Sequence, residues 1–160
     1  MLQIFVFIFH HFLYSPPIPF EYSKKLNTKF FLFPSITSKY LKMKTEHFYL
    51  EDSYTPIIYL IGQNAKDNFA VIDQASPNDL WFHAKRESSC HVVAIVGHLT
   101  IQNKEDEKEI IKHGAFLCKQ NTAKLADGKK IDIIYTEIKN IKKTKTPGLV
   151  TTQNTQTISV

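Results

Sequence analysis

The 160-residue sequence has only two cysteines and no long uninterrupted apolar run. Cys90 and Cys118 lie far apart, so neither a zinc ribbon nor a disulfide framework is indicated. The longest apolar stretch, Met1 to Tyr14, is interrupted by His10 and His11 and falls short of the roughly 18 to 20 residues that cross a bilayer. We therefore expect no membrane span. Two free thiols suit a reducing compartment, and we expect a cytoplasmic protein.

Apolar residues make up 43% of the chain and charged residues 22%, which is ordinary for a globular domain. The net charge of +5 is distributed unevenly. Residues 43–111 carry six basic and eleven acidic side chains, whereas residues 112–160 carry nine basic and three acidic ones. This polarity predicts an anionic partner for the C-terminal third of the chain.

Residues 1–42 differ in composition from the rest of the chain. They contain eight of the twelve phenylalanines and four of the seven prolines, and no helical or strand periodicity persists in them. Residues 1–42 fit neither a secretory signal, which should carry positive charge before its apolar run, nor a transit peptide, which should carry arginine. We interpret residues 1–42 as a non-globular leader, a gene-model artefact upstream of a true start at Met43. The alternative is a targeting or anchoring segment. Residues 43–160 then form the domain.

Runs of aromatic and β-branched residues bounded by turn signals predict seven strands. They lie at residues 47–51, 57–61, 79–85, 91–96, 131–137, 149–152 and 157–160. The last two are expected to form a closing hairpin around Gln153 and Asn154. The apolar run at residues 69–72 is too short for its periodicity to distinguish a strand from one helical turn.

The clearest helix signal covers residues 104–120. Asn103 can cap its start, and the acidic residues of its first turn match the positive end of the helix dipole. Ile110, Gly114 and Cys118 recur at helical spacing and should face a sheet, with Gly114 permitting a close approach. We therefore predict an α+β fold in one domain: a mainly antiparallel sheet packed against this one principal helix.

Trp81, His83 and Lys85 share one face of their predicted strand, because side chains alternate with period two. If paired residue numbers in the following hairpin sum to 174, His83 lies opposite His91, whereas an odd sum separates the two histidines. An exposed ring beside cations such as Arg86 can stack a base and neutralise its phosphates. The alternative is that Trp81 and both histidines are partly buried.

Lys139, Lys142, Lys143 and Lys145 fall within seven residues, just before Pro147-Gly148. Lysines on a turn near a sheet edge suit contacts with phosphates that do not depend on nucleotide sequence. Alternatively, they protect an exposed sheet edge against pairing with another chain.

The cysteines and histidines lack the tight pairs that zinc sites usually show. The sequence also lacks a glycine-rich phosphate loop and the His-Glu-x-x-His and Gly-x-Ser-x-Gly motifs. We therefore expect no metal, no cofactor and no enzymatic activity.

Several segments together resemble the RNA-binding domain of the NFACT family, which comprises ribosome-associated quality-control factors and their small stand-alone relatives. The matching segments are Gly62-Gln-Asn-Ala-Lys-Asp-Asn68, Asp79-Leu-Trp-Phe-His-Ala84, Ser89-Cys-His-Val-Val93, Ile134-Tyr-Thr136, Lys142-Lys143 and Pro147-Gly-Leu-Val150. The resemblance runs in the family's order from about Ile57 to Val160. One departure is that Ser89-Cys90-His91 replaces the family's Gly-Ser-His.

The resemblance implies a non-catalytic module that binds RNA, in a tRNA, rRNA or ribosomal setting, with a quality-control protein as a further partner. The alternative is a module that docks on a ribosomal or quality-control protein through its sheet edge or through acidic residues 105–109. The residues predicted to contact RNA are Asn64, Lys66, Asn68, Trp81, His83, Lys85, Arg86, His91, Lys139, Lys142, Lys143 and Lys145.

Overall fold

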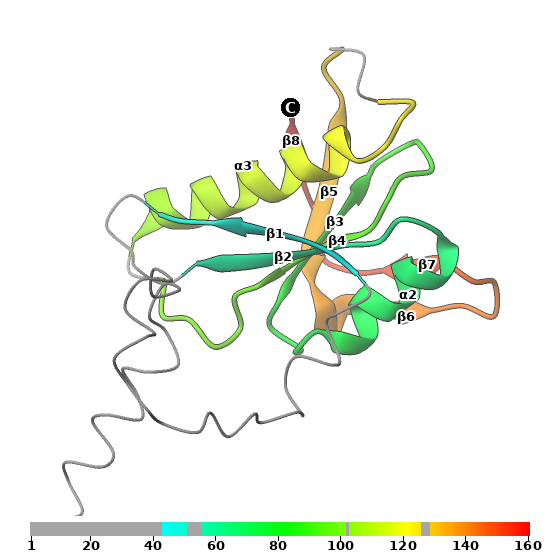
Figure 1. Cartoon of the computed structure of the whole chain (residues 1–160), viewed down its shortest axis with the longest axis horizontal. Coiled ribbons are helices and arrows are strands. Elements are labelled where there is room, and N and C mark those ends of the chain that lie inside the picture. The colour runs from blue at the N-terminus through cyan, green and yellow to red at the C-terminus, as the bar shows by residue number, and fades with distance from the viewer. Residues whose placement is uncertain (1–42, 51–55, 102, 126–128) are drawn as a thin grey trace, which may run out of the picture. The chain divides into compact units, whose positions relative to one another are not determined.

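The computed structural model describes residues 43–50, 56–101, 103–125 and 129–160 (Figure 1). The strands are β1 (Lys44–Phe48), β2 (Ile57–Ile61), β3 (Leu80–Ala84), β4 (Val92–Ile95), β5 (Asp132–Glu137), β6 (Ile141–Lys143), β7 (Val150–Thr152) and β8 (Gln156–Ser159). The helices are α2 (Ala65–Gln74), α3 (Lys104–Gln120) and the short 3₁₀ helix η2 (Ile138–Asn140). The leader predicted at residues 1–42 lies outside the described residues.

Six strands form one antiparallel sheet in the order β1-β2-β4-β3-β5-β8, and β6 pairs with β7 in a separate two-stranded sheet. The α+β class and the mainly antiparallel sheet are therefore confirmed. In the β3–β4 pair, Leu80 lies opposite Ala94 and Trp81 opposite Val93, so paired residue numbers sum to 174. This is the register that brings His83 next to His91.

Helix α3 covers one face of the six-stranded sheet and closes the larger hydrophobic core (Figure 1). The Asn103 side chain accepts a hydrogen bond of 2.8 Å from the Asp106 backbone N–H, which caps the helix as predicted. Ile110 is fully buried. A Cβ at Gly114 would lie 2.5 Å from the Phe82 ring, so the close approach of α3 to β3 requires glycine. The helix predicted over residues 104–120 is confirmed.

The opposite face of the same sheet carries a second, smaller core. It consists of Leu60, Val71, Trp81 and Val93, which come from β2, α2, β3 and β4. Partly buried Ile141 and Val150 of the β6–β7 hairpin pack against it. The sheet is therefore covered on both faces near its centre.

The prediction of a single principal helix omitted α2, which contains the ambiguous run at residues 69–72. The Asn64 side chain caps α2 by accepting hydrogen bonds of 3.0 Å from the backbone N–H groups of Lys66 and Asp67. Its Nδ2 in turn donates to the Asp67 carboxylate at 2.7 Å. The bonds from Lys66 and Asp67 satisfy backbone donors that the first turn of a helix leaves unpaired, and they start a helix in a polar segment.

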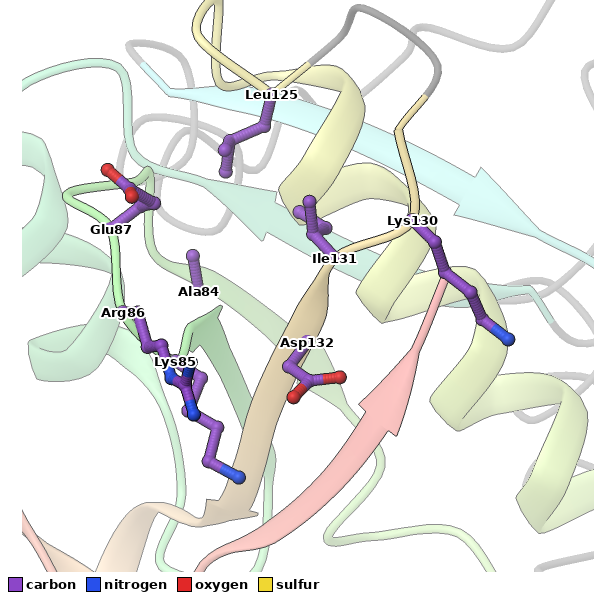
Figure 2. A pocket seen from close by; sticks show the side chains of 8 residues that line it. All are labelled: Ala84, Lys85, Arg86, Glu87, Leu125, Lys130, Ile131 and Asp132. Carbon is purple, nitrogen blue, oxygen red and sulfur yellow. The ribbon is translucent and has the colours of Figure 1, made fainter.

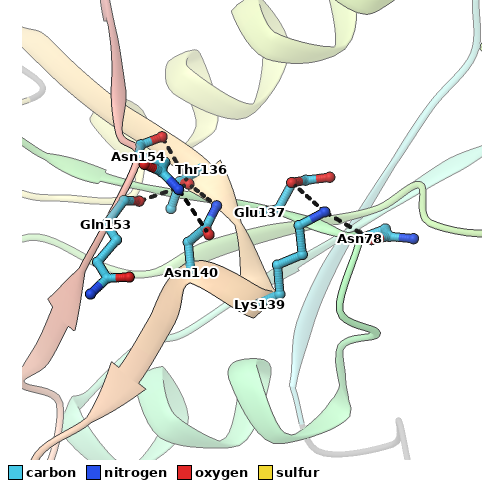
Figure 3. Close-up of polar contacts among 7 residues, drawn as sticks. All are labelled: Asn78, Thr136, Glu137, Lys139, Asn140, Gln153 and Asn154. Atoms are coloured by element: carbon cyan, nitrogen blue, oxygen red, sulfur yellow. Dashed lines mark hydrogen bonds and ion pairs between the residues drawn. The ribbon is translucent and has the colours of Figure 1, made fainter.

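The predicted closing hairpin is wrong, because β7 pairs with β6 whereas β8 pairs with β5. The chain changes sheets at Gln153 and Asn154, where Asn154 has a φ of +50°. Thr136 Oγ1 lies 3.2 Å from the carbonyl oxygens of both residues, and the Gln153 N–H donates to Asn140 O at 3.0 Å (Figure 3). This network holds the turn against the end of β5 and separates the two strands. The first strand also begins earlier than predicted, at Lys44.

Candidate nucleic-acid interface

A groove of about 830 Å³ lies where five separate segments of the chain meet. Its lining comes from the start of α2, the end of β3 with the loop that follows, the segment after α3, strand β5, and the loop between β6 and β7. The lining residues are Gln63, Asn64, Ala65, Asn68, His83, Ala84, Lys85, Arg86, Glu87, Ser88, Ser89, Cys90, Asn121, Thr122, Ala123, Lys124, Ile134, Pro147, Gly148 and Leu149. The groove thus gathers residues that are as much as 86 positions apart in the sequence.

Five of the twelve residues predicted to contact RNA line this groove: Asn64, Asn68, His83, Lys85 and Arg86. Lys85 and Arg86 are exposed and also line a neighbouring pocket of about 300 Å³ (Figure 2). Because they border both hollows, these two cations can contact a polyanion in either one.

Trp81 and His91 do not form the exposed aromatic surface that the sequence analysis considered. Each is only 1% exposed, because Trp81 belongs to the smaller core and His91 packs against Trp81. His83 is half-buried and lines the groove. Its ring lies parallel to the Trp81 indole, at 5.5 Å between centroids and an interplanar angle of 2°. Trp81 therefore supports His83 from within the protein, and a contact of Trp81 with RNA bases is corrected to a packing role.

His91 packs edge-on against both of these rings, at 5.1 Å from Trp81 and 5.2 Å from His83 between centroids. Burial and, to a smaller extent, the neighbouring His83 lower the pKa of His91 to about 4. Burial also lowers the pKa of His83. Both imidazoles are thus neutral at pH 7, and His83, the one that lines the groove, presents an uncharged ring to it.

Hydrogen bonds hold the two imidazoles and their surroundings in place. The His91 backbone N–H donates to Asn68 Oδ1 at 2.9 Å, and His91 Nδ1 lies 3.2 Å from Asn68 O. Asn68 is therefore occupied in holding His91 and has a structural role. His83 Nδ1 lies 2.7 Å from Ala84 O. Because a carbonyl can only accept, this contact places the proton on Nδ1 and leaves Nε2 of His83 as an acceptor.

The four predicted lysines of residues 139–145 do not form one patch. Lys139 pairs with Glu137 at 2.8 Å and donates to Asn78 Oδ1 at 3.4 Å, beside a different pocket (Figure 3). Lys143 pairs with Asp73 on α2. Lys142 and Lys145 are exposed on the β6–β7 hairpin.

The ion pairs found within the described residues involve only Lys108, Lys139 and Lys143 among the cations. Lys142 and Lys145 therefore remain available for phosphate contacts, as does exposed Lys66 in the first turn of α2. Lys139 and Lys143 are instead occupied by carboxylates.

Sequence reasoning missed two cations and one loop of this region. Lys124 lines the groove and Lys130 lines the neighbouring pocket, and both belong to the basic C-terminal third. Gly148, with a φ of +81°, brings the β6–β7 loop against the start of α2, where a Cβ would lie 3.0 Å from Ala65 Cα. The Pro-Gly pair signalled a turn, but nothing local indicates what the turn packs against.

In the part of the chain that the structure describes, no three His, Cys, Asp or Glu side chains gather closely enough to hold a metal ion. In the same part, no helix is both long and apolar enough to cross a membrane.

A family model described as the NFACT protein RNA binding domain matches residues 44–154. The match covers more than half of the chain, and it confirms the resemblance that the motifs indicated. It includes every segment that lines the groove.

Two curated proteins named coiled-coil domain-containing protein 25 are similar to this chain. The one from Mus musculus is 32% identical over 97 residues, which are 58% of this chain and 44% of that protein. The one from Bos taurus is 31% identical over 87 residues, which are 54% of this chain and 41% of that protein. The chain thus spans less than half the length of these relatives.

Among solved structures, the C-terminal part of the fibronectin/fibrinogen-binding protein from Streptococcus suis resembles this fold. The TM-score is 0.58 at 24% sequence identity, and the match covers 72% of this chain and 45% of that chain. At this identity the likeness shows the fold alone.

Proposed function

Because the chain belongs to the NFACT RNA-binding domain family, we propose that it is a non-catalytic module that binds RNA in the groove. The observation that supports this most is the convergence of Asn64, His83, Lys85, Arg86 and Lys124 on one hollow. Three cations around one neutral ring suit single-stranded nucleic acid, because phosphates require charge and bases require a flat partner on which to stack.

The phosphates are proposed to lie against Lys85, Arg86 and Lys124, at the end of the groove formed by the β3–β4 loop and the segment after α3. Arginine can hold a phosphate with two parallel hydrogen bonds, whereas the lysines act as mobile point charges. Lys142 and Lys145 on the β6–β7 hairpin extend the positive surface along a continuing strand of RNA. These contacts are sequence-independent and give binding that weakens with salt.

A base is proposed to stack on His83, whose ring is held parallel to the buried Trp81 indole. A neutral imidazole in a fixed orientation loses little conformational entropy when a base covers it. Its Nε2 acceptor, set by the contact of Nδ1 with Ala84 O, can receive a hydrogen bond from an amino or imino group of a base. His83 is thus proposed to supply whatever base preference the module has.

The family resemblance supports a cytoplasmic setting in which the RNA is tRNA or rRNA, as part of ribosome-associated quality control. We propose this setting and this class of RNA for the chain. The relatives of known name are more than twice as long as the matched region, so their whole-protein activities are not transferred to this chain.

Fluorescence anisotropy of labelled tRNA and rRNA fragments, titrated with the full chain at two salt concentrations, tests the proposal. The decisive variant replaces Lys85 and Arg86 with Gln. It should reduce the dependence of log affinity on log salt concentration by about 1.4 to 1.8, because two phosphate contacts are lost.

The matched control replaces Lys104 and Lys112 with Gln, which removes the same charge from exposed positions on α3. If both double variants weaken binding equally, net charge rather than the groove determines affinity. An affinity that is independent of salt in the unaltered protein would contradict the proposal.

A protein-docking module remains the second candidate, and one feature favours it. Glu105, Glu107 and Glu109 are exposed on α3, and Phe116 on the same helix is 50% exposed. An acidic helix with an exposed aromatic ring suits a basic protein partner. This candidate predicts that the immobilised chain still recovers a ribosomal or quality-control protein after nuclease treatment. The substitution Phe116→Ala should abolish that recovery.

A further inference from the structure

Cys90 and Cys118 lie together between the sheet and the C-terminal end of α3. Cys90 precedes β4 and Cys118 lies near the end of α3, so the chain brings together two thiols 28 positions apart. Cys118 is fully buried. Cys90 is 9% exposed and is among the residues that line the groove, whereas Cys118 is not.

The two side chains are interlocked by hydrogen bonds. Cys90 Sγ donates to Cys118 O at 3.4 Å, and Cys118 Sγ donates to Cys90 O at 3.5 Å. Thr122 Oγ1 lies 3.5 Å from Cys90 Sγ, and Ser89 Oγ lies 3.6 Å from Cys118 Sγ. Because each sulfur lies against the backbone of the other cysteine, the two thiols converge in one small polar site.

The surroundings make the two thiols chemically unequal. Hydrogen bonds from the Cys118 thiol and the Thr122 hydroxyl lower the pKa of Cys90 to about 7, although burial acts in the opposite direction. The contact with Cys90, together with burial, raises the pKa of Cys118. The thiolate is the nucleophilic form of cysteine, so Cys90 is the sulfur that reacts first.

We propose that Cys90 and Cys118 form an oxidation site at which a hydroperoxide converts the two thiols into an intramolecular disulfide. The proposal stands on the burial and mutual contacts of the two cysteines and does not depend on whether the groove binds RNA. The disulfide joins the segment before β4 to the end of α3, and both border the groove through Cys90 and Thr122.

The reaction takes place in two balanced steps. The Cys90 thiolate attacks one oxygen of hydrogen peroxide, so that an S–O bond forms and the O–O bond breaks. The departing hydroxide takes up the Cys90 proton and leaves as water. The Cys118 sulfur then attacks the sulfenic sulfur, so that an S–S bond forms and the S–O bond breaks, and the departing hydroxide takes up the Cys118 proton and leaves as a second water. Two thiols lose two electrons, and one peroxide is reduced to two waters.

Intact-mass spectrometry of the folded full chain, reduced and then exposed to hydrogen peroxide, tests this proposal. We expect the mass to fall by about 2 Da, the loss of two hydrogens, and to recover with dithiothreitol. Peptide mapping should find Cys90 joined to Cys118. Three results would overturn the proposal: oxygen added to the protein without a bond between the two sulfurs, disulfides formed only between chains, or no reaction.

Two variants assign the roles of the sulfurs. Cys118→Ser should leave a Cys90 sulfenic acid that dimedone labels, because the second thiol is absent. Cys90→Ser should leave Cys118 unoxidised at the same peroxide concentration, since it is fully buried. Serine is also the residue that the resembled family has at position 90. Oxidation of Cys118 in Cys90→Ser, with unchanged near-ultraviolet circular dichroism, would contradict the assigned order.

Discussion

The two faces of the six-stranded sheet are covered in different ways. On one face, the 17-residue helix α3 closes an apolar core that includes Phe82 and Ile110. On the other face, the 10-residue helix α2 and the short β6–β7 hairpin cover Trp81 but leave the groove beside His83. Both arrangements use the same strand, because successive residues of β3 point to opposite faces. The α3 face therefore provides most of the stability, and the α2 face provides the candidate interface.

Among the substitutions that compare the two faces, Phe82→Ala should have the largest effect, a loss of folding stability. It removes a fully buried ring from the core under α3 and should lower the free energy of unfolding by about 3 to 5 kcal/mol. Urea denaturation measures the loss. Phe116→Ala on the same helix is the control, since this ring is 50% exposed and should change stability by at most about 0.5 kcal/mol. Equal effects of the two substitutions would show that α3 does not close the principal core.

The α2 face should make stability depend on pH. The pKa of His91 is about 4 in the folded protein because of burial, and it returns toward about 6.5 on unfolding. Between these values the unfolded chain binds more protons, so stability is complete above pH 6.5 and is lost as the pH falls toward 4. The expected loss is on the order of 3 kcal/mol.

Denaturation at pH 7 and pH 5 measures the part of this loss that falls between those values, about 2 kcal/mol, with His91→Gln as the comparison. Glutamine retains a hydrogen-bond donor toward Asn68 O but does not titrate. The variant should lose less stability between the two pH values than the unaltered protein. The same loss in both proteins would mean that His91 is not the titrating group.

A smaller effect is expected on binding alone, from His83→Ala. Removing the proposed stacking ring should weaken RNA binding by about 5- to 150-fold, which corresponds to about 1 to 3 kcal/mol per base. His113→Ala is the matched control on the opposite face, where His113 stacks on Phe48 at 4.3 Å between centroids. Anisotropy titration compares the two variants. If His113→Ala weakens binding as strongly as His83→Ala, the groove is not the interface.

The smallest expected effect distinguishes Lys142 from Lys139. Lys142→Gln should reduce the salt dependence of binding by about 0.7 to 0.9 in log–log slope, because one phosphate contact is lost. Lys139→Gln should leave the slope unchanged, since Lys139 is already paired with Glu137 at 2.8 Å. Titrations at several salt concentrations distinguish the two lysines. A larger change for Lys139 would place the RNA along the β5–η2 edge instead.

Local patterns predicted much of the α3 face. Three signals were correct here: the Asn103 cap, the acidic first turn, and the spacing of Ile110, Gly114 and Cys118. Each reflects interactions within one helix or between that helix and one face of the sheet. The strands from β2 to β5 were located for the same reason, because alternation and turn residues act over a few positions.

Long-range packing could not be predicted from local patterns. The turn at Asn154 looked like a hairpin, but Thr136 and Asn140 hold it at the end of β5, where its two flanking strands diverge. The burial of Trp81 likewise depends on the β6–β7 hairpin, which is far from it in sequence, as well as on the nearer α2. The pairing of Lys143 with Asp73 spans 70 positions. The groove exists only when all these segments have assembled.

The most direct test of the account is ultraviolet crosslinking of a bound RNA to the full chain, followed by mass spectrometry of the crosslinked peptides. Crosslinks are expected in residues 63–68, 83–90, 121–124 and 147–149, which border the groove. Crosslinks confined to the outer surface of α3 or to β1, at undiminished affinity, would contradict it.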